Sequence, residues 1–127
     1  VVWLDLNYLK RTNDRYGHEE GDLLLINFAD LLRMAFEGIG TACRMGGDEF
    51  CVIIAKSMND SKIKKGVERM LSFIDEDNKG KHKYFMQASY GIAGSEEFEE
   101  PTSDRVCSMA DERMYRMKAA MKAQRTD

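Results

Sequence analysis

Apolar and polar residues recur along this chain at two periods, about 2 and about 3.6 residues, which predicts strands and helices in one fold. The opening segment, VVWLDL at 1–6, is a strand candidate in which Val1, Trp3 and Asp5 share one face. Asp5 therefore stands near the end of a predicted strand. The segment EEGD at 19–22 then opens a predicted helix, whose apolar face consists of Leu24, Phe28, Leu31, Leu32 and Ala35.

The pattern predicts further elements along the rest of the chain. The segments TAC at 41–43 and CVIIA at 51–55 flank a glycine turn, which predicts a β-hairpin. Alternation over 84–94 predicts another strand, and 75–83 reads as a charged loop. The remaining predicted helices are a short one at 9–16, one at 59–74 behind the capping candidates Asn59, Asp60 and Ser61, and a final one with the apolar stripe Val106, Met109, Ala110, Met114 and Met117.

These elements predict an α+β fold, with a central antiparallel sheet flanked by helices. A chain of 127 residues is long enough for one such domain with a substantial core, and 43% hydrophobic residues is too many for a disordered chain. The interpretation is a single domain that spans residues 1–127. Because the sequence begins inside a strand and without methionine, we expect a further segment before it in the parent protein.

Charge and cysteine content narrow the class of partner and the compartment. The formal net charge of -3 gives no basic footprint for nucleic acid, so no nucleic-acid partner is expected. Cys43, Cys51 and Cys107 are scattered through apolar segments, which is typical of small buried side chains rather than of disulfides or a metal cage. That favours a reducing, cytoplasmic compartment. No apolar run is long enough to span a bilayer, so no membrane segment is expected in this chain.

The hairpin segment RMGGDEF, at 44–50, contains more than a turn requires. Gly46 and Gly47 explain the change of direction, but the acidic residues Asp48 and Glu49 serve no turn geometry. One interpretation is solvated charge that discourages pairing at a sheet edge. The other is a functional site, and the sequence of the hairpin alone does not decide between them.

Four motifs decide it in favour of function. DLNYLK at 5–10, NDRYGHEEGD at 13–22, GGDEF at 46–50 and ADERMYRMK at 110–118 occur in this order, and together they resemble the GGDEF domain family of diguanylate cyclases. The resemblance covers nearly the whole chain. It implies a fold similar to the palm of nucleotide polymerases and the nucleotidyl cyclases, with the hairpin beside the end of the first strand.

The resemblance also implies a metal site and catalytic groups. Asp5 and Asp48 would be side-chain ligands of Mg²⁺ (or Mn²⁺), and the carbonyl of Leu6 would be a backbone ligand. Asp48 would also be the candidate proton acceptor, and Glu49 would assist at a second metal. Lys10 matches the lysine that stabilises phosphate charge in the transition state, although by itself it reads as a solvated helix lysine.

Further residues match the substrate site of the family. Asn13 and Asp22 would read guanine, although a turn and a helix cap are alternative roles for them. His18 would support the nucleotide pocket or be structural. The remaining matches are the hairpin residues Arg44, Gly46 and Gly47, which would approach the triphosphate, and Lys118 and Lys122, which would bind the terminal phosphates or else form a solvated basic face.

The implied function is condensation of two GTP molecules into cyclic di-GMP by a transient homodimer, controlled by an upstream sensor or receiver domain. The alternative is a GTP-binding regulatory module without turnover; the intact GGDEF hairpin favours the enzyme. The sequence departs from the family pattern in several places. The family's segment before the first strand is absent, EGIG at 37–40 replaces the R-x-x-D inhibitory site, Asn7 replaces a second aspartate, and Lys122 replaces an arginine.

Overall fold

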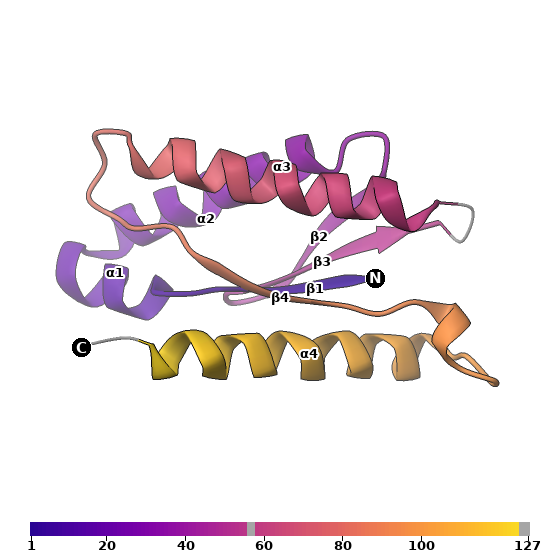
Figure 1. Ribbon diagram of the computed structural model, residues 1–127. Coiled ribbons are helices and arrows are strands. Elements are labelled where there is room, and N and C mark those ends of the chain that lie inside the picture. The colour runs from indigo at the N-terminus through magenta and orange to yellow at the C-terminus, as the bar shows by residue number, and fades with distance from the viewer. Residues whose placement is uncertain (56–57, 125–127) are drawn as a thin grey trace.

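The computed structural model describes residues 1–55 and 58–124. They form a four-stranded antiparallel sheet in the order β2-β3-β1-β4, which confirms the α+β prediction. Helices α2 and α3 cover one face of the sheet, and α4 runs along the other (Figure 1). The strands are β1 (Val2–Leu6), β2 (Gly40–Gly46), β3 (Glu49–Ile54) and β4 (Ala88–Ile92).

Strand β1 lies in the middle of the sheet and is buried on both faces. It pairs with β3 on one side and with β4 on the other, and both pairings are antiparallel. Val2, Leu4 and Leu6 point into the main core, where none is more than 1% exposed. The predicted alternation of β1 is therefore confirmed, and Asp5 lies on the face towards α4.

The helices follow the apolar patterns closely. They are α1 (Leu9–Tyr16), α2 (His18–Ala35), α3 (Asp60–Asn78) and α4 (Ser103–Ala123), with a short 3₁₀ turn η1 at Ser95–Glu97. The side chain of Asn59 caps α3 by accepting a hydrogen bond from the backbone of Lys62, as predicted. All five residues of the predicted apolar face of α2 are buried. Among the described residues, no helix is long and apolar enough to cross a membrane.

Two predicted boundaries were wrong. Helix α3 continues through Asn78, so the predicted charged loop at 75–83 begins four residues too early. Strand β4 starts at Ala88, although alternation predicted a strand from Tyr84. The segment at 84–87 has no regular secondary structure, and side chains rather than a neighbouring strand bind the backbone of Tyr84 and Met86.

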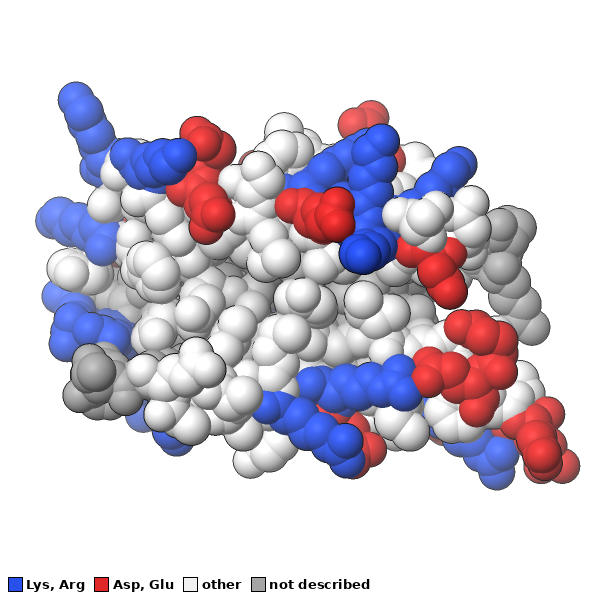
Figure 2. Space-filling view, viewed as in Figure 1, with Lys and Arg blue, Asp and Glu red and all other residues white. Residues whose placement is uncertain are grey.

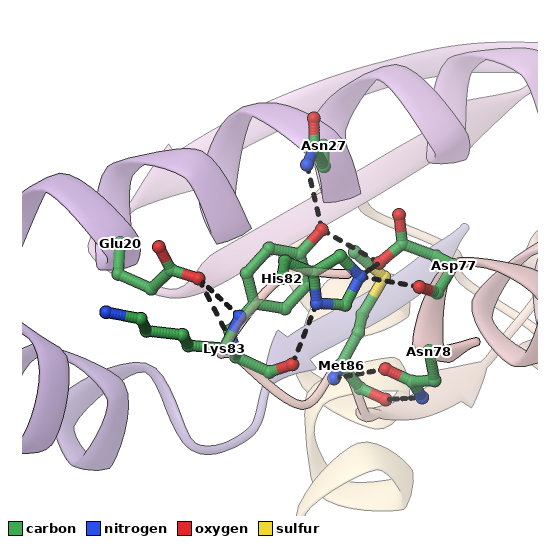
Figure 3. Close-up of polar contacts among 8 residues, drawn as sticks. Glu20, Asn27, Asp77, Asn78, His82, Lys83 and Met86 are labelled. Carbon is green, nitrogen blue, oxygen red and sulfur yellow. Dashed lines mark hydrogen bonds and ion pairs between the residues drawn. The ribbon is translucent and has the colours of Figure 1, made fainter. Parts of the chain in front are cut away.

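Figure 3 shows how this segment is held. One carboxylate oxygen of Glu20, in the first turn of α2, accepts hydrogen bonds from the backbone N–H groups of Lys83 and Tyr84. The side-chain amide of Asn78 both donates to and accepts from the backbone of Met86. The segment therefore connects the start of α2 to the end of α3 through side-chain hydrogen bonds rather than through pairing with a strand.

The prediction that the cysteines are small buried side chains is confirmed for Cys51 but is wrong for Cys43 and Cys107, which are only half-buried. Cys43, Cys51 and Cys107 are free thiols. Cys51 is buried in β3, and burial raises the pKa of its thiol to about 11. A thiol with that pKa stays protonated and unreactive at neutral pH.

Candidate active site

The site is built where β1 ends beside the turn between β2 and β3. Asp5 pairs with Glu49 across the β1–β3 ladder, and the N–H of Leu6 donates to the carbonyl of Asp48 over 2.8 Å. The backbone therefore brings the end of β1 against the hairpin, as the resemblance implied. Burial raises the pKa of Asp5, and the nearby carboxylate of Asp48 raises it further, while a hydrogen bond from Lys118 acts in the opposite direction.

The hairpin turn has the backbone geometry that its glycines permit. Gly46 has φ of 149° and Gly47 has φ of 51°, values that residues with a Cβ rarely adopt. The guanidinium of Arg44 donates two hydrogen bonds to the carbonyl of Gly47, over 3.1 and 2.8 Å. Arg44, a predicted substrate residue, therefore stabilises the turn that presents Asp48.

Asp5 has one carboxylate oxygen that is paired and one that is not. Lys118 Nζ, on α4, donates to Asp5 Oδ2 over 2.6 Å. Asp5 is only 6% exposed, and within the described part of the chain its Oδ1 has no hydrogen-bond partner. A buried carboxylate oxygen without a partner is costly and points to a ligand that the protein itself does not supply.

An open cleft of about 510 Å³ adjoins this carboxylate pair. Asp48 lies in its wall, and Lys10, Lys118 and Lys122 surround it with positive charge. In Figure 2 the left edge of the molecule, where α1 and the end of α4 lie, is mostly blue, whereas red gathers at the lower right. The cleft is lined by Leu6, Asn7, Tyr8, Leu9, Lys10, Arg11, Asp14, Arg15, Asp48, Lys118 and Lys122. This arrangement suits a ligand that carries several negative charges.

The donor set fits Mg²⁺ or Mn²⁺. Asp5 and Asp48 offer hard carboxylate oxygens at one place, and Asp5 Oδ1 is an orphaned acceptor. Over residues 1–55 and 58–124, no three His, Cys, Asp or Glu side chains form a group that could hold a metal. A cation here would therefore take only part of its ligands from side chains, and the rest from substrate phosphate, backbone or water, as Mg²⁺ commonly does.

Glu49 lies beside the carboxylate pair and towards α4. Burial raises the pKa of Glu49, and the carboxylates of Asp111 and Asp5 add to that effect. The carboxylate of Asp111 on α4 is a neighbour that the sequence did not indicate. Glu49 therefore belongs to the same acidic region as Asp5, and its role at a second metal stays a prediction.

The predicted guanine readers lie between α1 and α2, away from the lining of this cleft. Asn13 is half-buried in α1, and its side chain lies against Gly21 of α2, where a Cβ would come within 1.7 Å of Asn13 Oδ1. Asp22 and His18 are exposed on α2. Because α2 begins at His18, with Gly17 at its N-terminus, the alternative role of Asp22 as a helix cap is wrong.

Sequence reasoning missed a buried polar cluster behind the site. The side-chain amide of Asn7 donates to Ser89 Oγ over 3.0 Å, to Gln87 over 3.1 Å, and to the sulfur of Met121 over 3.6 Å. It thereby joins the end of β1 to β4 and to the helix that carries Lys118. The substitution of asparagine for aspartate at 7 was the one available signal, since an amide can donate to sulfur and a carboxylate cannot.

Comparison with known proteins gives one consistent family. Residues 1–124 match the family described as "Diguanylate cyclase, GGDEF domain". The diguanylate cyclase DgcS of Shewanella oneidensis is 32% identical over 120 residues, which are 94% of this chain and 39% of DgcS. The chain thus spans about two fifths of the length of that relative.

Solved structures agree with this match. The GGDEF domain of YfiN (TpbB) from Pseudomonas aeruginosa has a TM-score of 0.80 and 26% identity, over 94% of this chain and 74% of that one. An EAL/GGDEF domain protein from M. capsulatus has a TM-score of 0.78 and 27% identity, over 94% and 77% of the two chains. Because the family model matches residues 1–124 and the fold agrees with solved GGDEF domains, this chain belongs to the GGDEF domain family of diguanylate cyclases.

Proposed function

We propose that this chain is the catalytic domain of a diguanylate cyclase, which condenses two GTP molecules into cyclic di-GMP and releases pyrophosphate. The observation that carries the proposal is the pairing of Asp5 and Asp48 beside a lysine-lined cleft, with Asp5 Oδ1 buried and without a partner. The proposed domain covers residues 1–127, and the proposed location is the cytoplasm. An upstream sensor or receiver domain would control it.

Each residue has a role in this proposal. Asp5, Asp48 and the carbonyl of Leu6 would hold a divalent cation, and Glu49 would assist at a second one. When bound, such a cation neutralises charge on the triphosphate and lowers the pKa of the attacking hydroxyl. Lys10 would stabilise phosphate charge in the transition state, Lys118 and Lys122 would bind the terminal phosphates, and Asn13 and Asp22 would select guanine.

The chemistry requires two chains. Each GTP presents its 3′-hydroxyl to the α-phosphorus of the other; the new P–O bond forms as the bond to pyrophosphate breaks, and the hydroxyl proton passes to a carboxylate, for which Asp48 is the candidate. One site of this size holds one GTP, so two sites must face each other across a two-fold axis. We therefore propose a transient homodimer.

Incubation of the protein with GTP and Mg²⁺, followed by chromatography for cyclic di-GMP, tests the proposal. Specific activity should rise with protein concentration and then level off, and light scattering on the same samples should show dimer in the same range. Activity that is independent of concentration in a chain shown to be monomeric would contradict the two-chain mechanism. Binding of GTP with no product at any concentration would favour the regulatory module instead.

A further inference from the structure

The ion pair between Lys118 and Asp5 raises a question about the proposed site. Lys118 is expected to bind phosphate and Asp5 is expected to bind metal, yet the two side chains contact each other over 2.6 Å. We propose that Lys118 is an exchangeable counter-ion, which neutralises Asp5 in the absence of metal and turns to the triphosphate when a divalent cation binds. This inference rests on the proposed function and concerns the order of events at the same site.

Burial explains why Asp5 needs a positive partner. Its side chain is 9% exposed, and the carboxylate of Asp48 lies close by. A carboxylate at such depth, beside a second one, is unfavourable unless a positive charge compensates it. The ammonium of Lys118 supplies that charge on Oδ2, and Oδ1 is left with no partner in the described residues. A divalent cation would compensate the pair more fully than one ammonium group.

The position of Lys118 permits the exchange. Its side chain is 37% exposed, and it also lines the cleft in which we place the triphosphate. Lys122 follows one helical turn later on α4 and lines the same cleft. A lysine has a flexible stem and a compact charge, so it can reorient without moving the helix. Release of Lys118 by the metal would then add a positive charge to the phosphate region.

Removal of Lys118 should therefore strengthen the binding of the metal and weaken the binding of the nucleotide. In the Lys118→Met variant, Mn²⁺ no longer competes with an ammonium group, so we expect about tenfold tighter Mn²⁺ binding without nucleotide. The same variant should bind a non-hydrolysable GTP analogue more weakly when Mn²⁺ is present. With EDTA in place of Mn²⁺ the loss should be small, because Lys118 is then occupied by Asp5. Lys122→Met is the matched control, since it removes an equal charge from the same cleft but no contact with Asp5.

The experiment measures Mn²⁺ binding from the electron paramagnetic resonance signal of free Mn²⁺, and binding of the analogue by calorimetry. Thermal unfolding with and without Mn²⁺ shows that each variant folds, and Lys118→Met should gain more stability from Mn²⁺ than the parent does. The Lys122→Met variant should bind Mn²⁺ as the parent does, within about twofold once the loss of charge is screened by 0.15 M salt.

Three results would overturn the exchange. They are unchanged or weaker Mn²⁺ binding in Lys118→Met, an equal gain in Lys122→Met, and an equal loss of analogue affinity with and without Mn²⁺. Failure to form cyclic di-GMP, together with the expected Mn²⁺ results, would count against the proposed reaction and leave the exchange supported. The two ideas can therefore fail separately.

Discussion

The contact between Asn13 and Gly21 gives a sharp test of the proposed guanine reader. Replacement of Gly21 by alanine places a Cβ 1.7 Å from Asn13 Oδ1 and 2.8 Å from its Cγ, so the side chain of Asn13 must leave its position. The fold should tolerate the change. Alanine is favoured over glycine inside a helix by about 1 kcal/mol, and this gain offsets the cost of moving one flexible side chain.

The Gly21→Ala substitution should weaken GTP binding but leave the free energy of unfolding nearly unchanged. The loss of the Asn13 amide leaves guanine groups without a partner, at a cost of about 1–3 kcal/mol, or about 5- to 150-fold in affinity. Calorimetry with GTP and ATP should show that Gly21→Ala loses affinity for GTP and little for ATP, and urea unfolding should give a free energy within about 1 kcal/mol of the parent.

The double variant supplies the control for this reasoning. Because the two residues touch, Gly21→Ala combined with Asn13→Ala should bind GTP no more weakly than Asn13→Ala alone. Full additivity would show that Gly21 acts by another route. Unchanged GTP affinity in Gly21→Ala would refute the assignment of Asn13 to the base.

Three more predictions concern catalysis, feedback and acid stability. Asp48→Asn should lower the rate of cyclic di-GMP formation by about 100-fold or more. The thermal midpoint should change little, because the side chain lies half-buried at a turn. A rate equal to that of the parent would contradict the metal and proton roles proposed for Asp48. Inhibition by the product should be purely competitive with GTP, because Glu37 and Gly40 stand where the inhibitory R-x-x-D would supply arginine and aspartate. Initial rates at several product concentrations would reveal any non-competitive inhibition. The two hydrogen bonds from Arg113 lower the pKa of Glu97 to about 2 from 4.5, so this carboxylate stabilises the fold above pH 4.5 and loses its contribution as the pH falls towards 2. The pair is partly exposed, so Glu97→Gln should cost about 1 kcal/mol or less at pH 7 and flatten the acid side of a urea-unfolding profile; an unchanged profile would show that the pair contributes nothing.

Local pattern was sufficient to predict much of the fold. Alternation placed Asp5 on the proper face of β1, and helical spacing gave the buried face of α2 and the capped start of α3. Each of these features depends on residues a few positions apart, so the sequence carries the information locally. The prediction that the last strand begins at Tyr84 failed because side chains distant in sequence bind the backbone of the preceding segment. Glu20, for example, accepts a hydrogen bond from the backbone N–H of Lys83.

The candidate site was predictable only through motifs. Asp5 and Lys118 are 113 residues apart, and nothing in the sequence near either one indicates their ion pair. The hydrogen bonds of Asn7 likewise reach Ser89 and Met121, 82 and 114 residues away. Contacts over such separations depend on how sheet and helices pack, which periodicity does not specify. The resemblance supplied the list of residues, and the structure supplied their pairing.

Asp5 lies on a central strand of the sheet, whereas the lysines of the candidate site, Lys118 and Lys122, lie on the surface of α4. Next to Asp5, the N–H of Leu6 is bonded to the hairpin, and that of Asn7 is bonded to the carbonyl of Gln87 over 2.8 Å. Strand β1 is buried on both faces, so the carboxylate of Asp5 has little freedom to shift. Lys118 and Lys122 instead project from a helix surface into the cleft, where their stems can reorient. Under the proposed function, a metal ligand would require fixed geometry and a lysine that follows the leaving pyrophosphate would require freedom, so the two requirements would fall on different elements of the fold.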